Sequence, residues 1–449
     1  MIVFGNKTSR GIVARTGQCA LGLAVAMSLA GCDIDDLLSV DDPEFVTDES
    51  VTDPNAVPLV VRGALGEFYR AYSGSGLSNL GYLTASGLLT DELQSSDTFV
   101  DRNAVDARSL QPPELGNPSD LAYEWLQRAR RATIDAAETV AEVEGESDPD
   151  RALMLALNGF TYVAFGEGWC SAVPVSTLEG GDFVEGEPRS TEQLFQTALE
   201  RFQSAQSASA SNLAALGRAR TLLNLGQYQE AAAAVSGVPT SYVFLIEHSE
   251  NTYENPVWNL NNDNGRFTIL GNEGENGLAF RTADDPRIEV TIQVTPQGNR
   301  LGFDDSTPLY EQQKYPNRDA DVPLATGTEA RLIEAEAALN AGNSGTFLQL
   351  LNDLRATVDG LEPLTDPGTQ EGRVDLLFRE RAFWLYLTGH RLGDMRRLVD
   401  QYGRSIDDVY PVGTSTQGQP YGNDVVFSVP FEEEQNSLFS RSACVTTQT

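Results

Sequence analysis

The chain has 449 residues, 65 of them acidic and 31 basic, and its formal net charge at pH 7 is −34. Nucleic acid and anionic membrane surfaces both repel a polyanion, so the composition argues against either as a partner. The two histidines, His248 and His390, are far apart in the sequence and near no cysteine cluster, so no transition-metal site is predicted.

Residues 1–31 have the features of a secretory signal peptide. They carry three basic residues, no acidic residue and an apolar run from Cys19 to Ala30. That run is shorter than the roughly 20 residues that a membrane span needs. The sequence Leu29-Ala30-Gly31-Cys32 at its end fits a bacterial lipobox, so we expect cleavage before Cys32 and lipidation of its thiol. The chain from Cys32 onward has a net charge of −37, because the signal removes three basic residues and no acidic ones.

The stretch after the predicted lipidation site is acidic. It opens with Asp33-Ile34-Asp35-Asp36, contains proline and has few aromatic residues. Such a composition does not bury enough apolar surface to fold by itself. We therefore predict that residues 32–55 form an acidic tether and that a folded domain begins at residue 56.

Apolar residues recur at helical spacing through the first part of this domain. The spacing predicts helices over 56–72, 82–93, 121–140 and 151–165. In 121–140 the apolar stripe is narrow and rich in alanine, which favours close packing against another helix. Ser190 and Gln193 form a capping-box pair that predicts the start of a further helix.

Two later segments are typical of tetratricopeptide helical hairpins. In the first, Ala219, Gly226, Tyr228 and Ala231 hold the positions of the small residue, the turn, the aromatic residue and the second-helix alanine. The second segment covers 329–358 and has its turn at 342–345. Small residues at these positions allow the two helices of a hairpin to approach closely.

Between the hairpins, residues 240–327 lose helical periodicity and are rich in Gly, Asn, Asp and Pro. Short strands are predicted at 242–247, 266–270 and 288–294. A loop-rich stretch of this length is unusual inside a compact domain unless it has a function. We therefore treat 240–327 as a candidate ligand lobe.

Sugars bind by stacking on aromatic faces and by hydrogen bonds to polar groups, and this lobe offers both. Trp258 is the first candidate ligand-binding residue and Tyr253 the second. Asn261 and Asp263 are candidate polar partners. The alternative is that each aromatic ring only packs against its own loop.

Catalytic and metal-binding motifs do not fit the sequence. A G-x-S-x-G nucleophile motif is absent, and GTSTQG at Gly413 has the wrong spacing. A calcium-binding loop within 259–271 does not fit. With Gly265 at the invariant sixth position, the first and twelfth positions are Leu260 and Gly271, where acidic ligands are needed. We predict no catalytic residue, no metal and no cofactor.

The segment 373–398 concentrates charge on a helical pattern, with Gly389 expected to break the helix. Its sequence R-E-R-A-F-W-L-Y-L-T-G-H-R-L-G-D-M-R-R resembles the late helical signature of the SusD/RagB family of outer-membrane nutrient-binding lipoproteins. Tyr386 and Thr388 stand where that family commonly has acidic residues, which leaves the ion-pair partners of Arg391 and Arg397 open. The matching residues are Glu380, Arg381, Gly389, His390, Arg391, Asp394, Met395, Arg396 and Arg397.

The resemblance implies a mostly α-helical fold in which tetratricopeptide-like hairpins form the scaffold and a loop-rich lobe carries a few short strands. It implies a single SusD-like domain over 56–449. This domain comprises a scaffold (56–239 and 328–400), the ligand lobe (240–327) and an irregular tail (401–449). Cys170 and Cys444 are either free or joined in one disulfide that ties this tail to the scaffold.

The resemblance also implies a function. It points to a lipoprotein of the outer membrane, facing the cell exterior, since the acidic run after Cys32 resembles the surface-export signal of such relatives. The protein would capture oligosaccharides or peptides and deliver them to a TonB-dependent, SusC-like barrel, without being an enzyme. The main alternative is a tetratricopeptide-type scaffold that binds only proteins, and a lipid-anchored hydrolase is the third.

Overall fold

The structure is a computed structural model that describes residues 55–75, 79–179 and 182–449. The predicted signal peptide, Cys32 and all but the last residue of the predicted tether lie outside the described residues. Lipidation and the signal peptide therefore stay predictions. Within the described part of the chain, no helix is both long enough and apolar enough to cross a membrane.

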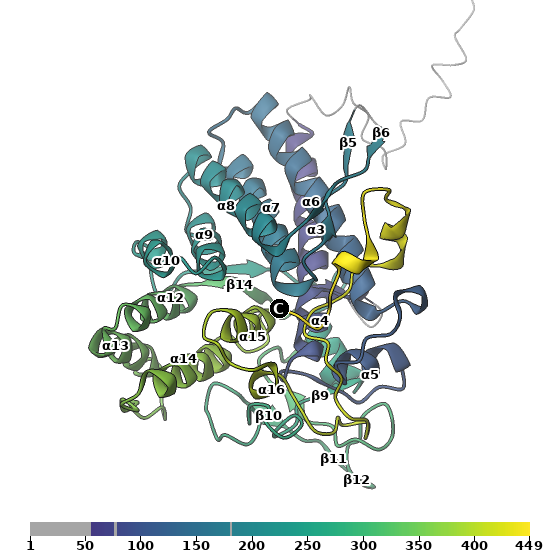
Figure 1. The fold of residues 1–449 in the computed structure, drawn as a ribbon, viewed down its shortest axis with the longest axis vertical. Coiled ribbons are helices and arrows are strands. Elements are labelled where there is room, and N and C mark those ends of the chain that lie inside the picture. Colours follow the sequence, from purple (N-terminus) through teal and green to yellow (C-terminus); the bar gives the residue numbers. More distant parts are fainter. Residues whose placement is uncertain (1–54, 76–78, 180–181) are drawn as a thin grey trace, which may run out of the picture. The chain divides into compact units, whose positions relative to one another are not determined.

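Helices dominate the described residues and confirm the predicted fold class (Figure 1). The longer helices are α3 (Val57–Ser73), α4 (Tyr82–Leu89), α6 (Pro118–Val143), α7 (Pro149–Gly168), α8 (Thr191–Ala208), α9 (Asn212–Asn224), α10 (Tyr228–Val235), α12 (Gly327–Asn340), α13 (Ser344–Arg355), α14 (Gln370–Trp384) and α15 (Arg391–Asp400). The shorter ones are α5 (Val100–Asp106), α11 (Pro256–Trp258), α16 (Ile406–Val409) and the 3-10 turns Pro113–Leu115, Phe431–Gln435 and Arg441–Ala443.

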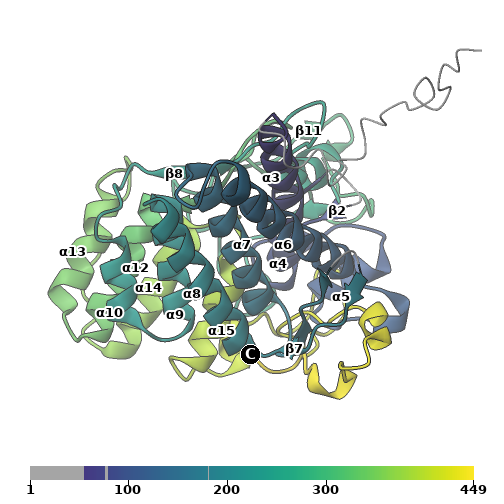
Figure 2. The ribbon, with the colours of Figure 1, turned by 90° about the horizontal axis from the view of Figure 1, so that it is seen from above.

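Consecutive helices pack side by side. α6 lies against α3 and α7, α7 against α8, and α8 against α9; Figure 2 shows α6, α7 and α8 running alongside one another. α7 is central, since every residue from Met154 to Gly168 is buried. The predicted capping box is present at the start of α8, where Ser190 and Gln193 exchange backbone and side-chain hydrogen bonds.

The two predicted helical hairpins are confirmed. α9 and α10 meet at Gly226, and α12 and α13 meet at Gly342, with φ values of 70° and 73° that favour glycine. Ala219 and Ala231 are fully buried, as close approach of the two helices requires. α10 also packs against α12, so the hairpins join although the candidate lobe separates them in sequence.

The segment 373–398 forms two helices, as the expected break at Gly389 implies. α14 ends at Trp384 and α15 begins at Arg391. The break includes Gly389, as predicted, with a φ of 78°, but it begins earlier, and Leu387 also has a positive φ of 51°. The intervening residues turn the chain so that α15 packs against α4 and α7.

Three arginines of this segment, Arg381, Arg391 and Arg397, are buried and paired with carboxylates. Arg381 donates two hydrogen bonds to Asp394, of 2.8 and 2.9 Å, and Arg397 pairs with both Asp394 and Glu336. Arg391 donates two hydrogen bonds to Asp91, of 2.7 and 2.8 Å. Buried charges need such partners. The family commonly has acidic residues at the positions of Tyr386 and Thr388. Here Asp91 and Glu336, from distant parts of the chain, supply the carboxylates that pair with Arg391 and Arg397.

Strands are short and form only two-stranded antiparallel pairs among the described residues. The pairs are β1 (Gly74–Ser75) with β2 (Asn79–Leu80), β3 (Gln94–Ser95) with β9 (Phe267–Thr268), β4 (Val173–Pro174) with β7 (Pro188–Arg189), β5 (Thr177–Glu179) with β6 (Asp182–Val184), β8 (Val243–Ile246) with β14 (Val322–Thr326), β10 (Val290–Thr291) with β13 (Glu311–Gln312), and β11 (Val294–Thr295) with β12 (Gly298–Asn299). The predicted strands over 242–247 and 266–270 correspond to β8 and β9. The predicted strand over 288–294 contains β10 and the first residue of β11.

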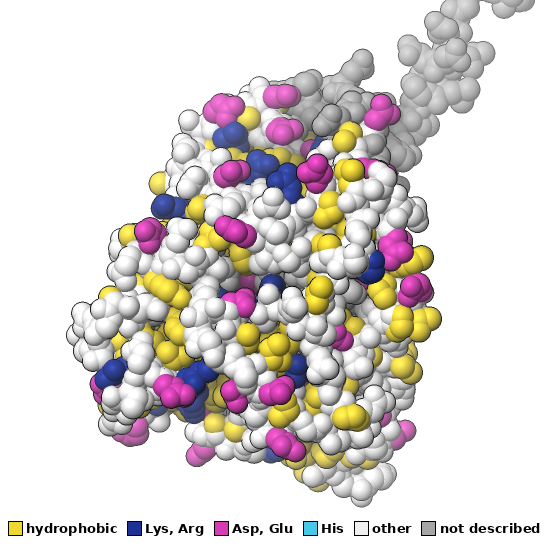
Figure 3. Space-filling view, viewed as in Figure 1, with side chains coloured by type: hydrophobic (Ala, Val, Ile, Leu, Met, Phe, Trp, Pro, Cys, Tyr) yellow, Lys and Arg dark blue, Asp and Glu magenta, His cyan; other side chains and the backbone are white. Residues whose placement is uncertain are grey.

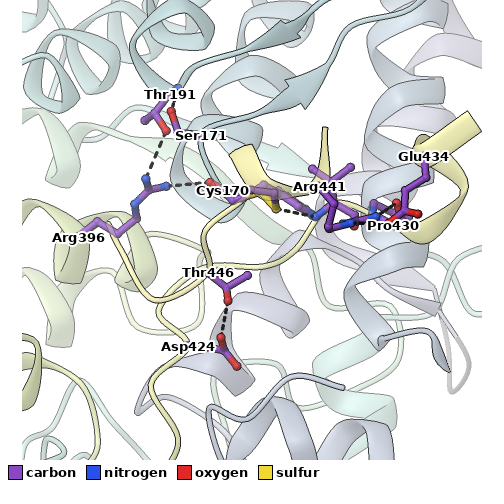
Figure 4. The surroundings of a disulfide bond; sticks show 12 residues. Cys170, Ser171, Thr191, Arg396, Asp424, Pro430, Glu434, Arg441 and Thr446 are labelled. Carbon is purple, nitrogen blue, oxygen red and sulfur yellow. Dashed lines mark hydrogen bonds and ion pairs between the residues drawn. A yellow bond between two sulfur atoms is a disulfide. The ribbon is translucent and has the colours of Figure 1, made fainter. Parts of the chain in front are cut away.

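A disulfide between Cys170 and Cys444 joins the end of α7 to the tail, with 5.1 Å between the two Cα atoms (Figure 4). The sequence left this pairing open. Beside it, Arg441 pairs with Glu434 and donates hydrogen bonds to the carbonyl oxygens of Val429 and Pro430. The adjacent Trp169 is fully buried, with the rings of Tyr123, Phe165 and Phe427 at centroid distances of 5.9, 5.4 and 5.4 Å.

Candidate ligand-binding site

The candidate lobe is tied to the scaffold through the segment that follows α4. β3 pairs with β9, so that Ser95 lies opposite Phe267, and the amide of Ser96 donates to the carbonyl oxygen of Arg266 at 2.8 Å. α5 begins a few residues later and lies next to β9 in Figure 1. α4 ends at Leu89, whereas the predicted helix extended to residue 93.

Asp97 organises the charges at this junction. Its fully buried carboxylate pairs with Arg266 of the lobe at 2.6 Å and with Arg102 of α5 at 2.7 Å. Burial lowers the pKa of Arg102, and the charge of Asp97 opposes that shift. Because arginine stays protonated in proteins, both guanidinium groups keep their charge and their positions.

Two phenylalanine rings flank the guanidinium of Arg266. Its central carbon lies 4.8 Å from the ring centroid of Phe99 and 3.8 Å from that of Phe303. Phe99 is 47% exposed and Phe303 46% exposed, although each is large and apolar. Cation–π contacts hold the rings in place while leaving much of their surface open to solvent. We refer to Phe99, Arg266 and Phe303 as the aromatic clamp.

Polar groups surround the aromatic clamp. Gln417 of the tail donates to the carbonyl oxygen of Ser95 and to the Oδ2 atom of Asp304, both at 3.1 Å. Burial tends to raise the pKa of Asp304, but hydrogen bonds from Thr307 and its neighbours outweigh burial and hold the pKa below its usual value. A carboxylate, an amide and backbone groups therefore stand beside two exposed ring surfaces.

Trp258, the first predicted ligand residue, is partly buried. It ends α11, and its amide donates a hydrogen bond to the Oδ1 atom of Asn255 at 3.0 Å, which caps the start of this helix. The guanidinium carbon of Arg318 lies 5.3 Å from its ring centroid, and Arg318 pairs with Glu254 at 3.5 Å. Trp258 thus has a cation over its ring, as the two phenylalanines of the aromatic clamp do.

Tyr253, the second predicted residue, is also partly buried and lies beside α3. Its hydroxyl is 3.8 Å from the position that a Cβ atom on Gly66 would occupy. Its carbonyl oxygen lies 3.0 Å from Nδ1 of His248, whose pKa is lowered by burial. The backbone of Tyr253 therefore holds its loop, while the ring lies against the scaffold.

Asn261 and Asp263 belong to a single π-helical turn over Asn259–Asp263, which directly follows Trp258. Asn261 is fully buried. It donates to the carbonyl oxygens of Phe267 and Tyr310 at 2.8 and 2.9 Å, and accepts from the amide of Gln312 at 2.8 Å. These bonds occupy Asn261 inside the lobe, whereas Asp263 is exposed.

Gly265 links this turn to the aromatic clamp. Its carbonyl oxygen accepts hydrogen bonds from the amide of Phe303 at 2.7 Å and from the hydroxyl of Ser96 at 2.9 Å. Neither Phe99 nor Phe303 is among the ligand residues predicted from the sequence. A usable signal was the aromatic residue two positions after Asp97 in a polar loop, but Arg266, which pairs with Asp97, is 169 residues away in the sequence.

On the face seen in Figure 3, acidic, basic and apolar side chains are interspersed. Among the residues that the structure describes, no group of three or more His, Cys, Asp or Glu side chains is placed to hold a metal ion. The aromatic clamp and its polar surroundings offer ring faces for stacking and groups for hydrogen bonds.

The SusD family model matches residues 311–437, which include β14, the second helical hairpin and the 373–398 segment. The solved structures that resemble this chain include a SusD-like protein from Bacteroides fragilis, with a TM-score of 0.63 and 15% identity over 88% of this chain and 98% of that one. The predicted resemblance is confirmed, and the fold is SusD-like.

Two further SusD-like structures match at similar levels. A superfamily protein from Parabacteroides distasonis has a TM-score of 0.64 and 13% identity, covering 88% of this chain and 99% of that one. A SusD-like carbohydrate binding protein from Bacteroides vulgatus has a TM-score of 0.61 and 14% identity, covering 86% and 97%. No curated protein sequence matches the chain. At these identities the matches establish the fold and do not transfer a ligand.

Proposed function

We propose that this SusD-like protein is a cell-surface, lipid-anchored binding protein that captures oligosaccharides or peptides and passes them to a TonB-dependent, SusC-like barrel. The lipobox at Cys32 supports the anchor, and the SusD-like fold supports the place at the outer membrane. A similar structure from Bacteroides vulgatus is described as carbohydrate binding, which supports a sugar ligand. The protein acts by binding and not by catalysis.

The aromatic clamp is the observation that carries this proposal. Apolar rings as large as Phe99 and Phe303 are normally buried, and leaving both about half exposed on ordered loops needs a reason. A sugar ring stacks on such a surface through its C–H groups, with the polar side chains of Asp304 and Gln417 beside it. Arg266 fixes the spacing of the two rings, so the surface is formed before a ligand arrives.

The test measures the affinity for an oligosaccharide selected on a glycan array. Phe99→Ala and Phe303→Ala should each weaken binding by about 10-fold or more, since a buried stacking contact contributes about 1–3 kcal/mol. Phe431→Ala is the matched control. Phe431 is 40% exposed in the 3-10 turn over Phe431–Gln435 and should leave affinity unchanged. Equal affinities for all three variants and the wild type would show that the aromatic clamp does not bind the ligand.

Trp258, Tyr253 and Asp263 are proposed as a second part of the same ligand surface. Trp258→Ala should weaken binding of longer oligosaccharides more than that of short ones. The turn over Asn259–Asp263 and Gly265 separate Trp258 from the aromatic clamp, so only a longer ligand contacts both. Asn261 holds that turn in place through its hydrogen bonds inside the lobe. If Trp258→Ala leaves the affinity for every ligand length unchanged, the ring serves only to pack its loop.

The alternative is a tetratricopeptide-type scaffold that binds only other proteins. Copurification of a barrel together with a glycan-array signal would favour nutrient capture, whereas partner binding without any small ligand would favour the scaffold. Turnover of a polysaccharide by the purified protein would contradict both.

A further inference from the structure

The scaffold contains a cavity of about 400 Å³ that belongs neither to the candidate lobe nor to the aromatic clamp. Its lining residues come from α6, α7 and α8, from β5 and β7, and from Val175, which follows β4. Small-molecule sites usually have volumes of roughly 300–1,000 Å³. A second cavity of about 270 Å³ adjoins this one, since Arg130, Arg131 and Thr177 line both.

Basic residues outnumber acidic ones in the lining of the larger cavity, which we call the arginine cavity. The chain as a whole has a formal net charge of −34 and repels anions, so this surplus of positive charge is local. Figure 3 shows basic side chains close together over α6, α7 and α8, with acidic ones around them. The basic lining residues are Arg130, Arg131, Arg189 and Arg201, and the acidic ones are Glu138 and Glu200.

Neutral groups hold Arg130 in the wall of this cavity. Arg130 is 5% exposed and donates hydrogen bonds to the Oε1 atom of Gln127 at 2.9 Å and to the carbonyl oxygen of Ser176. These acceptors fix the guanidinium group but leave its charge unmatched. Buried arginines normally pair with carboxylates, as Arg381 and Arg391 do elsewhere in this protein.

The other arginines of the cavity differ in their pairing. Arg131 has a carboxylate at ion-pair distance, Asp135 at 2.7 Å, whereas Arg130, Arg189 and Arg201 have none among the described residues. The Nε atom of Arg201 is buried and has no hydrogen-bond partner in this part of the chain. Arg189 is exposed to solvent. Three guanidinium groups without a carboxylate therefore line one cavity.

The cavity also contains an unused hydrogen-bond acceptor. Asn158 of α7 is 1% exposed, and its Nδ2 atom donates to the carbonyl oxygen of Arg130 at 2.7 Å and to the Oγ1 atom of Thr133 at 3.1 Å. Its Oδ1 atom is buried and has no partner among the described residues. A buried amide oxygen without a donor costs free energy. A ligand hydroxyl would supply the missing donor, and Tyr162 and Thr197 add hydroxyl groups to the same lining.

We propose that the arginine cavity binds a saccharide that carries carboxylates, such as a chain of uronic acids. The planar guanidinium group of arginine matches the two oxygens of a carboxylate, so arginines without a partner favour this anion. The free oxygen of Asn158 favours a ligand that also carries hydroxyls, which a simple anion lacks. The choice of a saccharide rests on the proposed function, whereas the preference for an anion rests on the arginines alone.

The test measures affinities by isothermal titration calorimetry in the double variant Phe99→Ala with Phe303→Ala, so that the aromatic clamp does not contribute. Trigalacturonate carries carboxylates and hydroxyls, maltotriose carries hydroxyls only, and tricarballylate carries carboxylates only. Trigalacturonate should bind at least about 10-fold more tightly than either of the others, because it alone can engage both the arginines and Asn158. Its affinity should fall as salt is added, since salt screens the charges.

In the same background, Arg201→Gln and Arg189→Gln should each weaken trigalacturonate binding by about 10-fold, since each removes a charge-assisted hydrogen bond. Arg62→Gln is the matched control and should leave the affinity unchanged, because Arg62 is an exposed arginine of α3 that lines neither cavity. Circular dichroism checks that the variants are folded.

Absence of trigalacturonate binding, or an unchanged affinity in both Arg201→Gln and Arg189→Gln, would overturn the proposal. Tricarballylate binding as tight as that of trigalacturonate would assign the cavity to simple anions and overturn the choice of a saccharide. The proposed function is tested separately, with the glycan-array ligand at the aromatic clamp. Failure at the arginine cavity is therefore distinguishable from failure of the proposed function.

Discussion

Phe202 of α8 occupies space that two glycines on neighbouring helices leave open. A Cβ atom on Gly159 of α7 or on Gly217 of α9 would lie closer than 3.0 Å to the ring of Phe202. The ring also makes an edge contact with Phe160 at a centroid distance of 5.1 Å. The close packing of α7, α8 and α9 therefore depends on the absence of side chains at two positions.

Gly217→Ala should lower the free energy of unfolding by about 1–3 kcal/mol, because the new methyl group overpacks the core. Gly63→Ala in α3 is the control. Nothing lies within 4 Å of its Cβ position, so the variant should gain up to about 1 kcal/mol from helix propensity. Urea unfolding of both variants measures the difference. A Gly217→Ala variant as stable as Gly63→Ala would show that Phe202 moves aside freely.

At the scale of elements, α15 is held to the segment after α4 by Arg391 and Asp91, whose side chains are 7% and 1% exposed. This contact matters for the candidate site, because the same segment continues into β3, Asp97 and Phe99. The helix therefore supports the loop that carries one ring of the aromatic clamp.

Asp91→Ala should cost about 3–5 kcal/mol, since it leaves a buried guanidinium without its partner. The double variant Asp91→Ala with Arg391→Ala should cost less than the sum of the two single changes. Glu371→Ala breaks the exposed contact with Arg404, in which Glu371 is 74% exposed, and should cost less than about 1 kcal/mol. Chemical denaturation gives all four values, and additive losses at Asp91 and Arg391 would contradict the coupling.

At the scale of the whole molecule, buried carboxyl groups make stability depend on pH. Burial raises the pKa of Asp106 to about 7 and that of Glu92 to about 8. Burial and the neighbouring Asp106 raise the pKa of Glu273 well above its ordinary value. Glu273 also accepts hydrogen bonds from Gln94 and Tyr421, so this group joins the segment after α4, the lobe and the tail.

The folded protein therefore binds more protons than the unfolded chain until these groups ionise, and stability falls as pH rises. Between pH 6.5 and 8 the free energy of unfolding should fall by about 1.4 kcal/mol per pH unit for each carboxyl still protonated in the native state. The lowered pKa values of His248 and His390 act in the opposite direction below about pH 6.5, and the pKa of Lys314, lowered to about 8, does so as pH approaches and passes 8. Glu273→Gln should flatten the slope measured by urea unfolding at several pH values; an unchanged slope would contradict this assignment.

Much of the helical scaffold is predictable from the sequence because its signals are local. Apolar spacing predicted the helices that became α3, α6 and α7, and the Ser190–Gln193 pair predicted the start of α8. The two hairpins followed from glycines and alanines at fixed positions. In each case the residues that decide the structure lie within a few turns of one another, so periodicity and capping are sufficient.

The candidate site was decided by tertiary structure. Trp258 and Tyr253 are predicted because they are aromatic residues in a polar lobe, whereas the aromatic clamp depends on the β3–β9 pair, which joins residues far apart in the chain. The ion-pair partner of Arg391 is equally distant in sequence, since Arg391 pairs with Asp91 and not with a residue of its own segment. Local patterns determine which helices form, because helical contacts span four residues. Only the packed chain determines which rings stay exposed and which charges meet, because those outcomes depend on what surrounds each side chain.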